Sequence, residues 1–99
     1  MLPFKESQMC IEVRTKILNI DTDIDAGESK IETEIIEIID KALEDVAGKM
    51  LRMEFLSYLN SLISTLLLGA VDLINKGKMS FAQLDICKKT RLILKNMLP

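Results

Sequence analysis

Apolar residues recur every three or four positions along most of the chain, which is the spacing of one face of an α-helix. The clearest stripe runs from Ile31 to Val46, and the acidic residues of this segment lie largely outside it. Ser29 followed three residues later by Glu32 is the pattern of a capping box, in which each side chain satisfies a backbone N–H of the other residue. The pattern predicts an amphipathic helix that begins at Ser29 and ends or bends at Gly48.

A second, longer apolar segment follows. It predicts a helix from about Met50 or Met53 to Lys76, stopped by Gly77. Residues 55–71 carry no charge, a run just short of the length of a membrane-spanning helix. On a helical wheel, however, the hydroxyl and amide side chains gather in one arc of roughly 140°, opposite the large apolar residues. Such segregation is typical of a helix packed in a bundle, so we expect no membrane span.

The last predicted helix has two start signals that agree. Ser80 and Gln83 form a second capping box, and Met79 and Leu84 stand where a hydrophobic staple would close. The short link over residues 75–78 predicts that the third and fourth helices pack as an antiparallel hairpin.

The segment from Ser7 to Asn19 fits two structures. Its alternation of apolar and charged residues would suit a short strand. It also contains a helical stripe with steps of three and four, formed by Cys10, Val13, Ile17 and Ile20. We favour the helix, followed by an acidic, turn-forming linker from Asp21 to Gly27.

Together these segments predict an all-α protein, a small antiparallel bundle of three to four helices that ends in a helical hairpin. The 99 residues fit a single domain, with an N-terminal helix and acidic linker over residues 1–27 and the core helices over residues 28–99. Hydrophobic residues make up 48% of the chain but include only three Phe and one Tyr. We therefore expect an aliphatic core filled by methionine.

The composition argues against catalysis. The chain has no His, the commonest general base and metal ligand. Cys10 and Cys87 lack the CxxC spacing of a zinc or redox site, and we expect buried free thiols rather than a disulfide. No nucleophile with its base and no glycine-rich phosphate loop is recognisable, so we expect neither an enzyme nor a cofactor. The first residues lack the apolar run of a secretory signal, which indicates a cytoplasmic protein.

Charge is concentrated in two blocks. Residues 21–45 hold ten acids against two lysines, whereas residues 76–99 hold six bases against one acid. The two blocks can neutralise each other, either within a monomer or across a dimer.

One spacing in the acidic block is that of a calcium-binding loop. Acids occupy the first, third, fifth and twelfth positions of such a loop: Asp21, Asp23, Asp25 and Glu32. Two departures count against a metal, because Ala26 takes the place of the sharp-turn glycine and Glu28 stands where an apolar residue is needed. We favour an acidic linker with no bound metal.

One arc of the third predicted helix indicates a contact surface. Small residues repeat there every four positions and form a ridge that lets another helix approach closely: Ser57, Ser61, Thr65 and Gly69. Leu68 and Val71 lie in or beside the same arc, where a monomer would leave them in water. They are either isolated exposed apolar residues, which are common, or part of a dimer or partner interface.

The last predicted helix carries a basic stripe, Lys88, Arg91 and Lys95, with Lys89 nearby. Phosphate contacts of a nucleic acid would use such a face. The sequence pI is about 5.1, however, and no aromatic or base-reading residues accompany the stripe. We favour a solvated face, or one that answers the acidic helix.

Less than half of the chain resembles a known family. The small enterobacterial biofilm-regulator proteins of the YmgB/AriR type are similar in four stretches: the acidic amphipathic residues 35–43, the break near Gly48, residues 55–62 (FLSYLNSL) and residues 71–76 (VDLINK). The resemblance implies a helical, dimer-forming connector that feeds stress signals into a two-component system and so affects biofilm formation and acid resistance. The chain departs from that pattern at residues 47–50, which replace a polar Asn/Asp-rich loop, and in its additional basic helix.

These patterns predict a small non-enzymatic regulatory or adaptor protein that binds other proteins through its helices, with a homodimer as the leading assembly. The alternative is a nucleic-acid-binding transcriptional regulator that uses the basic C-terminal helix. A further alternative is a chaperone or inhibitor of a partner protein, or a calcium-responsive module.

Overall fold

The computed structural model of the protein describes the backbone of residues 1–22 and 28–99 and the side chains of residues 1–22 and 30–99. Over these residues the chain forms five helices and no strand. They are α1 (Phe4–Leu18), α2 (Glu28–Leu43), α3 (Lys49–Leu68), α4 (Ala70–Asn75) and α5 (Phe81–Met97). The prediction of an all-α fold is confirmed, and the ambiguous N-terminal segment is a helix.

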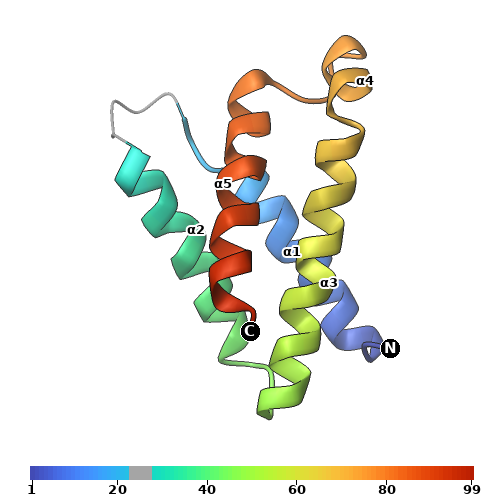
Figure 1. The fold of residues 1–99 in the computed structure, drawn as a ribbon, viewed down its shortest axis with the longest axis vertical. Helices are drawn as coiled ribbons and strands as arrows, with labels where there is room; N and C mark the ends of the chain where they lie inside the picture. The colour runs from blue at the N-terminus through green and yellow to red at the C-terminus, as the bar shows by residue number, and fades with distance from the viewer. Residues whose placement is uncertain (23–27) are drawn as a thin grey trace.

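The helices enclose a shared apolar interior (Figure 1). Both α3 and α2 contact α1 and α5. Figure 1 shows α5 beside α3, with α1 behind them and α4 at the far end of α3. The chain reverses direction after α4, so that α5 returns alongside α3. As a result, one side of α3 packs against the protein and the opposite side faces outward.

The interior is aliphatic, as the composition predicts. Fully buried side chains come from α1, α2, α3 and α5 and include Ile17, Ile35, Ile39, Leu59, Ile63 and Ile86. Phe55 is the one buried aromatic residue in the described part of the chain, whereas Phe4 and Phe81 are exposed. Methionine contributes at Met79, which is buried, and at Met9 and Met97, which are partly buried against the core, whereas Met50 lies on the surface.

α5 begins with the predicted capping box. The backbone N–H of Gln83 donates to Ser80 Oγ at 3.0 Å, and the backbone N–H of Ser80 donates to Gln83 Oε1 at 3.0 Å. Gln83 Nε2 also donates to the carbonyl oxygen of Leu18 at 3.2 Å. The cap therefore fixes the start of α5 and ties it to the end of α1.

The third predicted helix is divided in two. α3 ends at Leu68 and α4 begins at Ala70, with Gly69 between them at φ −94° and ψ 8°. The Leu73 N–H donates to the Gly69 carbonyl at 3.0 Å, so helical bonding resumes directly after the break. The prediction of an uninterrupted helix is wrong at Gly69, because glycine has a low intrinsic preference for the helical conformation.

The predicted stop at Gly77 is confirmed. Gly77 has φ 72°, a left-handed conformation that glycine adopts without steric cost. Its N–H donates to the Ile74 carbonyl at 3.0 Å, and the Lys78 N–H donates to the Leu73 carbonyl at 2.8 Å. The two bonds form a Schellman motif and satisfy carbonyl groups that the end of α4 would otherwise leave unpaired.

Replacing Gly77 with alanine is expected to lower the free energy of unfolding by about 1 kcal/mol, because alanine is strained in the left-handed conformation. A Cβ at this position meets no atom within 4 Å, so the backbone alone carries the cost. Urea denaturation followed by circular dichroism measures the change. Gly69→Ala is the control, because Gly69 has a negative φ and its added Cβ lies an ordinary 3.7 Å from the Thr65 carbonyl oxygen. Equal losses in the two variants contradict this account.

α2 ends earlier than predicted. The helix stops at Leu43, and the following turn buries Val46. Arg52 Nε donates to the Val46 carbonyl at 2.9 Å and so ties this turn to α3. Gly48, which was expected to end or bend α2, instead precedes α3 as its N-cap residue with φ 81°. α2 ends in a tight turn, in which the N–H groups of Asp45 and Val46 donate to the carbonyl oxygens of Ala42 and Leu43, three residues earlier.

α3 is amphipathic, as the helical wheel predicts. Phe55 and Leu59 are fully buried, whereas Ser57 and Ser61 are exposed. Among the helices over residues 1–22 and 28–99, none is long and apolar enough to cross a membrane.

Candidate interaction surface

The outward side of α3 carries the predicted ridge of small residues. We define the outer face of α3 by five exposed positions along the helix: Met50, Ser57, Ser61, Thr65 and Leu68. Leu68 is 91% exposed and Met50 is 76% exposed. No residue from 57 to 68 is charged. The outer face is therefore uncharged from Ser57 to Leu68, about three helical turns, whereas Glu54 is exposed between Met50 and Ser57.

The hydroxyl groups on the outer face are bonded within the helix. Ser61 Oγ donates to the carbonyl oxygen of Ser57 at 3.1 Å, and Thr65 Oγ1 donates to that of Ser61 at 2.9 Å. Their hydrogens are already used, so a second helix packed here need not supply acceptors for them. Because these side chains are also short, this stretch permits another helix to approach closely.

The far end of the outer face is apolar. Leu68 closes α3, Gly69 is half-buried, and Val71 of α4 is 74% exposed. Ala70, between these exposed residues, is buried in the core. The structure thus brings the predicted residues Leu68 and Val71 to the surface at one helix junction, where they leave apolar area in water.

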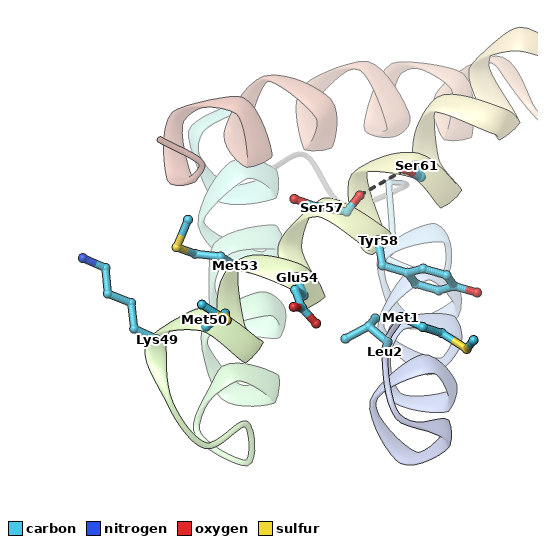
Figure 2. A pocket seen from close by; sticks show the side chains of 9 residues that line it. All are labelled: Met1, Leu2, Lys49, Met50, Met53, Glu54, Ser57, Tyr58 and Ser61. Atoms are coloured by element: carbon cyan, nitrogen blue, oxygen red, sulfur yellow. Dashed lines mark hydrogen bonds between the residues drawn. The ribbon is translucent and has the colours of Figure 1, made fainter.

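An open groove adjoins the other end of the outer face (Figure 2). Its volume is about 790 Å³. It is lined by the N-terminal segment and the first half of α3: Met1, Leu2, Lys49, Met50, Met53, Glu54, Ser57, Tyr58 and Ser61. Figure 2 shows Tyr58 on the side of the N-terminal segment and Met53 on the opposite side, with Glu54 between them. Because Ser57 and Ser61 belong to both features, the groove and the ridge are continuous.

Sequence reasoning did not find this groove. Its walls come from residues 1–2 and residues 49–61, and no local pattern indicates that these segments meet. The available signal was the methionine-rich start of α3, where Met50 shares the polar arc with Ser57.

The predicted basic stripe lies on α5 beside α3. Lys88, Arg91 and Lys95 are exposed and, with Leu67 and Leu92, line a hollow of about 240 Å³ that we call the α3–α5 hollow. Over the described residues, the three cations form no ion pair and no side-chain hydrogen bond. The structure therefore confirms that the three bases share one surface and adds two leucines to it.

Lys89 does not belong to this surface. Its side chain is only 13% exposed, and its ammonium group pairs with Asp85 one turn earlier on α5. α2 contacts α5, but the described side chains form no ion pair between the acids of α2 and the basic stripe. These side chains therefore do not form the ion pairs that were expected between the stripe and the acidic helix.

The predicted calcium spacing falls partly on residues that the structure does not describe. Asp23 and Asp25 lie outside the described residues, as does the side chain of Ser29 in the predicted cap of α2. Asp21 and Glu32 are both exposed. Within the described residues, no group of three or more carboxylates or thiols is placed to hold a metal ion.

Both cysteines are buried free thiols, as predicted. Cys10 Sγ donates to the carbonyl oxygen of Phe55 at 3.5 Å. Burial raises the pKa of Cys10 from 9.0 to about 12 and also raises the pKa of Cys87. Because the thiolate is the reactive form, neither side chain is placed to act as a nucleophile.

A thiol reagent at pH 8 is expected to modify both cysteines slowly in the native protein and rapidly once urea unfolds the chain.

The free energy of unfolding is expected to fall as the pH rises from 9 towards 12. In the unfolded chain Cys10 ionises near pH 9, whereas the buried thiol resists ionisation up to about pH 12. A comparison of pH-dependent urea denaturation in the wild type and Cys10→Ala isolates this loss. An identical pH dependence in the two proteins contradicts it.

Comparisons with known proteins found no relative of this chain. No protein-family model matches the chain, and no curated protein or solved structure is significantly similar to it.

Proposed function

We propose that the protein is a small non-enzymatic regulatory or adaptor protein, an antiparallel helical bundle that binds proteins through the outer face of α3 and forms a homodimer. The observation that carries the proposal is the uncharged outer face itself, which leaves Leu68 91% exposed. Water-facing helix surfaces normally carry charged and polar residues, and α2 shows this pattern on its exposed side. An uncharged stretch of exposed helix that ends in exposed apolar residues, as residues 57–68 do at Leu68, is typical of a surface that another protein covers.

A homodimer fits this face because every side chain of the ridge is small. In a two-fold symmetric dimer the same patch contacts itself, so a surface without charge has no like charges to oppose each other. Ser57, Ser61 and Thr65 permit the two α3 helices to approach closely, and Leu68 is buried when they do.

The length of the surface is sufficient for a dimer interface. A stable interface buries about 800 Å² on each partner. The chain exposes 6377 Å², so the interface takes about an eighth of its surface. The ridge together with the groove at Met50 and Tyr58 gives a surface that runs the length of α3, which spans about 30 Å.

The resemblance to the YmgB/AriR type agrees with this proposal. Proteins of that family are dimer-forming connectors of two-component systems, and the shared stretches include residues 55–62 of α3. The additional helix α5 packs on the inward side of α3 and leaves the outer face uncovered. We therefore include a role in stress signalling in the cytoplasm, with effects on biofilm formation, in the proposed function.

Sedimentation equilibrium of the purified protein tests the homodimer. The monomer mass is 11.2 kDa, and we expect the average mass to rise towards twice this value through the micromolar concentration range. A constant mass of 11.2 kDa over that range, together with no partner retained from a lysate of the native host, would overturn the proposal.

A further inference from the structure

The basic stripe of α5 is not explained by the homodimer. Lys88, Arg91 and Lys95 lie outside the outer face of α3 and are unpaired over the described residues. Three like charges within two helical turns repel one another, so leaving them without counter-ions lowers stability slightly. A surface of this kind is stabilised by a partner that brings negative charge.

The α3–α5 hollow places apolar groups among these cations. Leu67 and Leu92 line the same 240 Å³ volume as the three basic side chains, and Leu92 is 64% exposed. A water molecule takes roughly 30 Å³, so the hollow has room for an apolar side chain. Cations around an apolar depression fit a ligand with an apolar side chain flanked by acids.

We infer that the α3–α5 hollow binds an acidic amphipathic helix of a partner protein. The partner helix buries its apolar stripe against Leu67 and Leu92. Its carboxylates pair with the three cations of the basic stripe, Lys88, Arg91 and Lys95. The inference rests on the proposed adaptor function, whose partner chemistry it specifies, but it does not require the homodimer.

A second copy of the chain does not offer such a helix. α2 is acidic and amphipathic, but its apolar residues Ile35 and Ile39 are fully buried in its own core. Ile36 is 38% exposed and is the large apolar side chain that α2 presents outward in the described part of the chain. The acidic helix must therefore come from a different protein.

Nucleic acids and lipid surfaces fit the hollow less well. A phosphate backbone would contact the cations but leave Leu92 in water, and the chain as a whole is acidic with a pI of about 5.1. A bilayer surface is flat on the scale of a side chain, whereas Leu67 is half-buried within a concave site. An apolar side chain on a helix can enter that site.

Fluorescence anisotropy with three synthetic peptides tests the inference. The first peptide is a helix with a leucine stripe flanked by glutamates, the second is its scrambled isomer, and the third has glutamine in place of glutamate. We expect the first peptide to bind the wild type at least tenfold more tightly than the other two, and we expect its affinity to fall as salt is raised. A DNA duplex and vesicles that contain phosphatidylserine are measured in parallel.

Protein variants locate the binding site. The triple variant Lys88→Gln, Arg91→Gln and Lys95→Gln is expected to weaken peptide binding tenfold or more, and Leu92→Ser is expected to weaken it several-fold. The matched control replaces three exposed lysines away from the hollow, Lys30, Lys76 and Lys78, with glutamine; it removes the same charge and should leave binding unchanged.

The outcomes separate this inference from the homodimer. Sedimentation of the triple variant is expected to give the wild-type average mass, since the outer face of α3 is intact. Failure of the acidic peptide to bind, equal loss in the lysine control, or tighter binding of the DNA or the vesicles overturns the inference, whatever the oligomeric state. A peptide that binds a strictly monomeric protein supports the inference and contradicts only the homodimer.

Discussion

Replacing Phe55 with alanine is expected to lower the free energy of unfolding by about 3–5 kcal/mol, the range for removing a fully buried aromatic side chain. Phe55 is 0% exposed and lies on the side of α3 that packs against α1 and α5. Its own carbonyl oxygen accepts the thiol hydrogen of Cys10 on α1. A domain of this size is stable by about 5–15 kcal/mol, so the variant loses a large share of its free energy of unfolding. Urea denaturation followed by circular dichroism measures the loss.

Phe4→Ala is the control for this experiment. Phe4 begins α1 and is 79% exposed, so its replacement is expected to change the free energy of unfolding by less than about 0.5 kcal/mol. Two results contradict the described core: a loss below 1 kcal/mol for Phe55→Ala, or similar losses for the two variants.

Replacing Ser61 with arginine is expected to raise the dissociation constant of the homodimer at least a hundredfold. Ser61 is the central residue of the ridge and is exposed in the monomer, so arginine fits the isolated helix without strain. In the dimer the long side chain separates the two α3 helices and places two like charges near the symmetry axis. Sedimentation equilibrium over the micromolar range measures the shift, and circular dichroism confirms that the variant is folded.

Thr15→Arg is a matched control for Ser61→Arg. Thr15 is exposed on α1, and its Oγ1 donates to the carbonyl oxygen of Ile11 at 3.0 Å, just as Ser61 Oγ donates to the carbonyl four residues earlier. The control therefore loses the same kind of hydrogen bond and gains the same charge at a site away from the outer face. Dimers of equal strength in the two variants are incompatible with an interface on α3.

Local patterns predicted much of this fold because they reflect local physics. The capping box at Ser80 and the stop at Gly77 depend on backbone groups within a few residues, and both are confirmed. The N-terminal segment was ambiguous because its strand-like alternation extends over only a few residues. The helical stripe decides the matter, since every one of its members is buried: Cys10, Val13, Ile17 and Ile20.

Features that depend on tertiary packing were not predicted. α2 ends at Leu43, five residues before Gly48, although Val46 is buried as its place in the apolar stripe predicts. Asn60, which the wheel placed in the polar arc, is half-buried, and its Oδ1 is buried without a hydrogen-bond partner in the described structure. The pattern of one helix shows which residues share a face, but not how close a neighbouring helix lies.

The candidate surface was predicted only where it depends on the spacing of residues along one helix. The ridge at Ser57, Ser61 and Thr65 follows from spacing on one helix and is exposed as expected. The groove beside it and the α3–α5 hollow are each formed by two segments distant in sequence. Lys89 illustrates the limit, because it adjoins Lys88 in the chain but pairs with Asp85 and stays outside the hollow.

The most direct test of the interface on α3 is cysteine cross-linking at Ser61. The native cysteines are buried, so Ser61→Cys introduces the one readily reactive thiol in the described part of the folded chain. With a short bis-maleimide reagent at micromolar protein concentration, we predict that most of the Ser61→Cys protein is recovered as a covalent dimer and that a Thr15→Cys control is not. Recovery of Ser61→Cys as a fully modified monomer, with no more dimer than the control, contradicts the account.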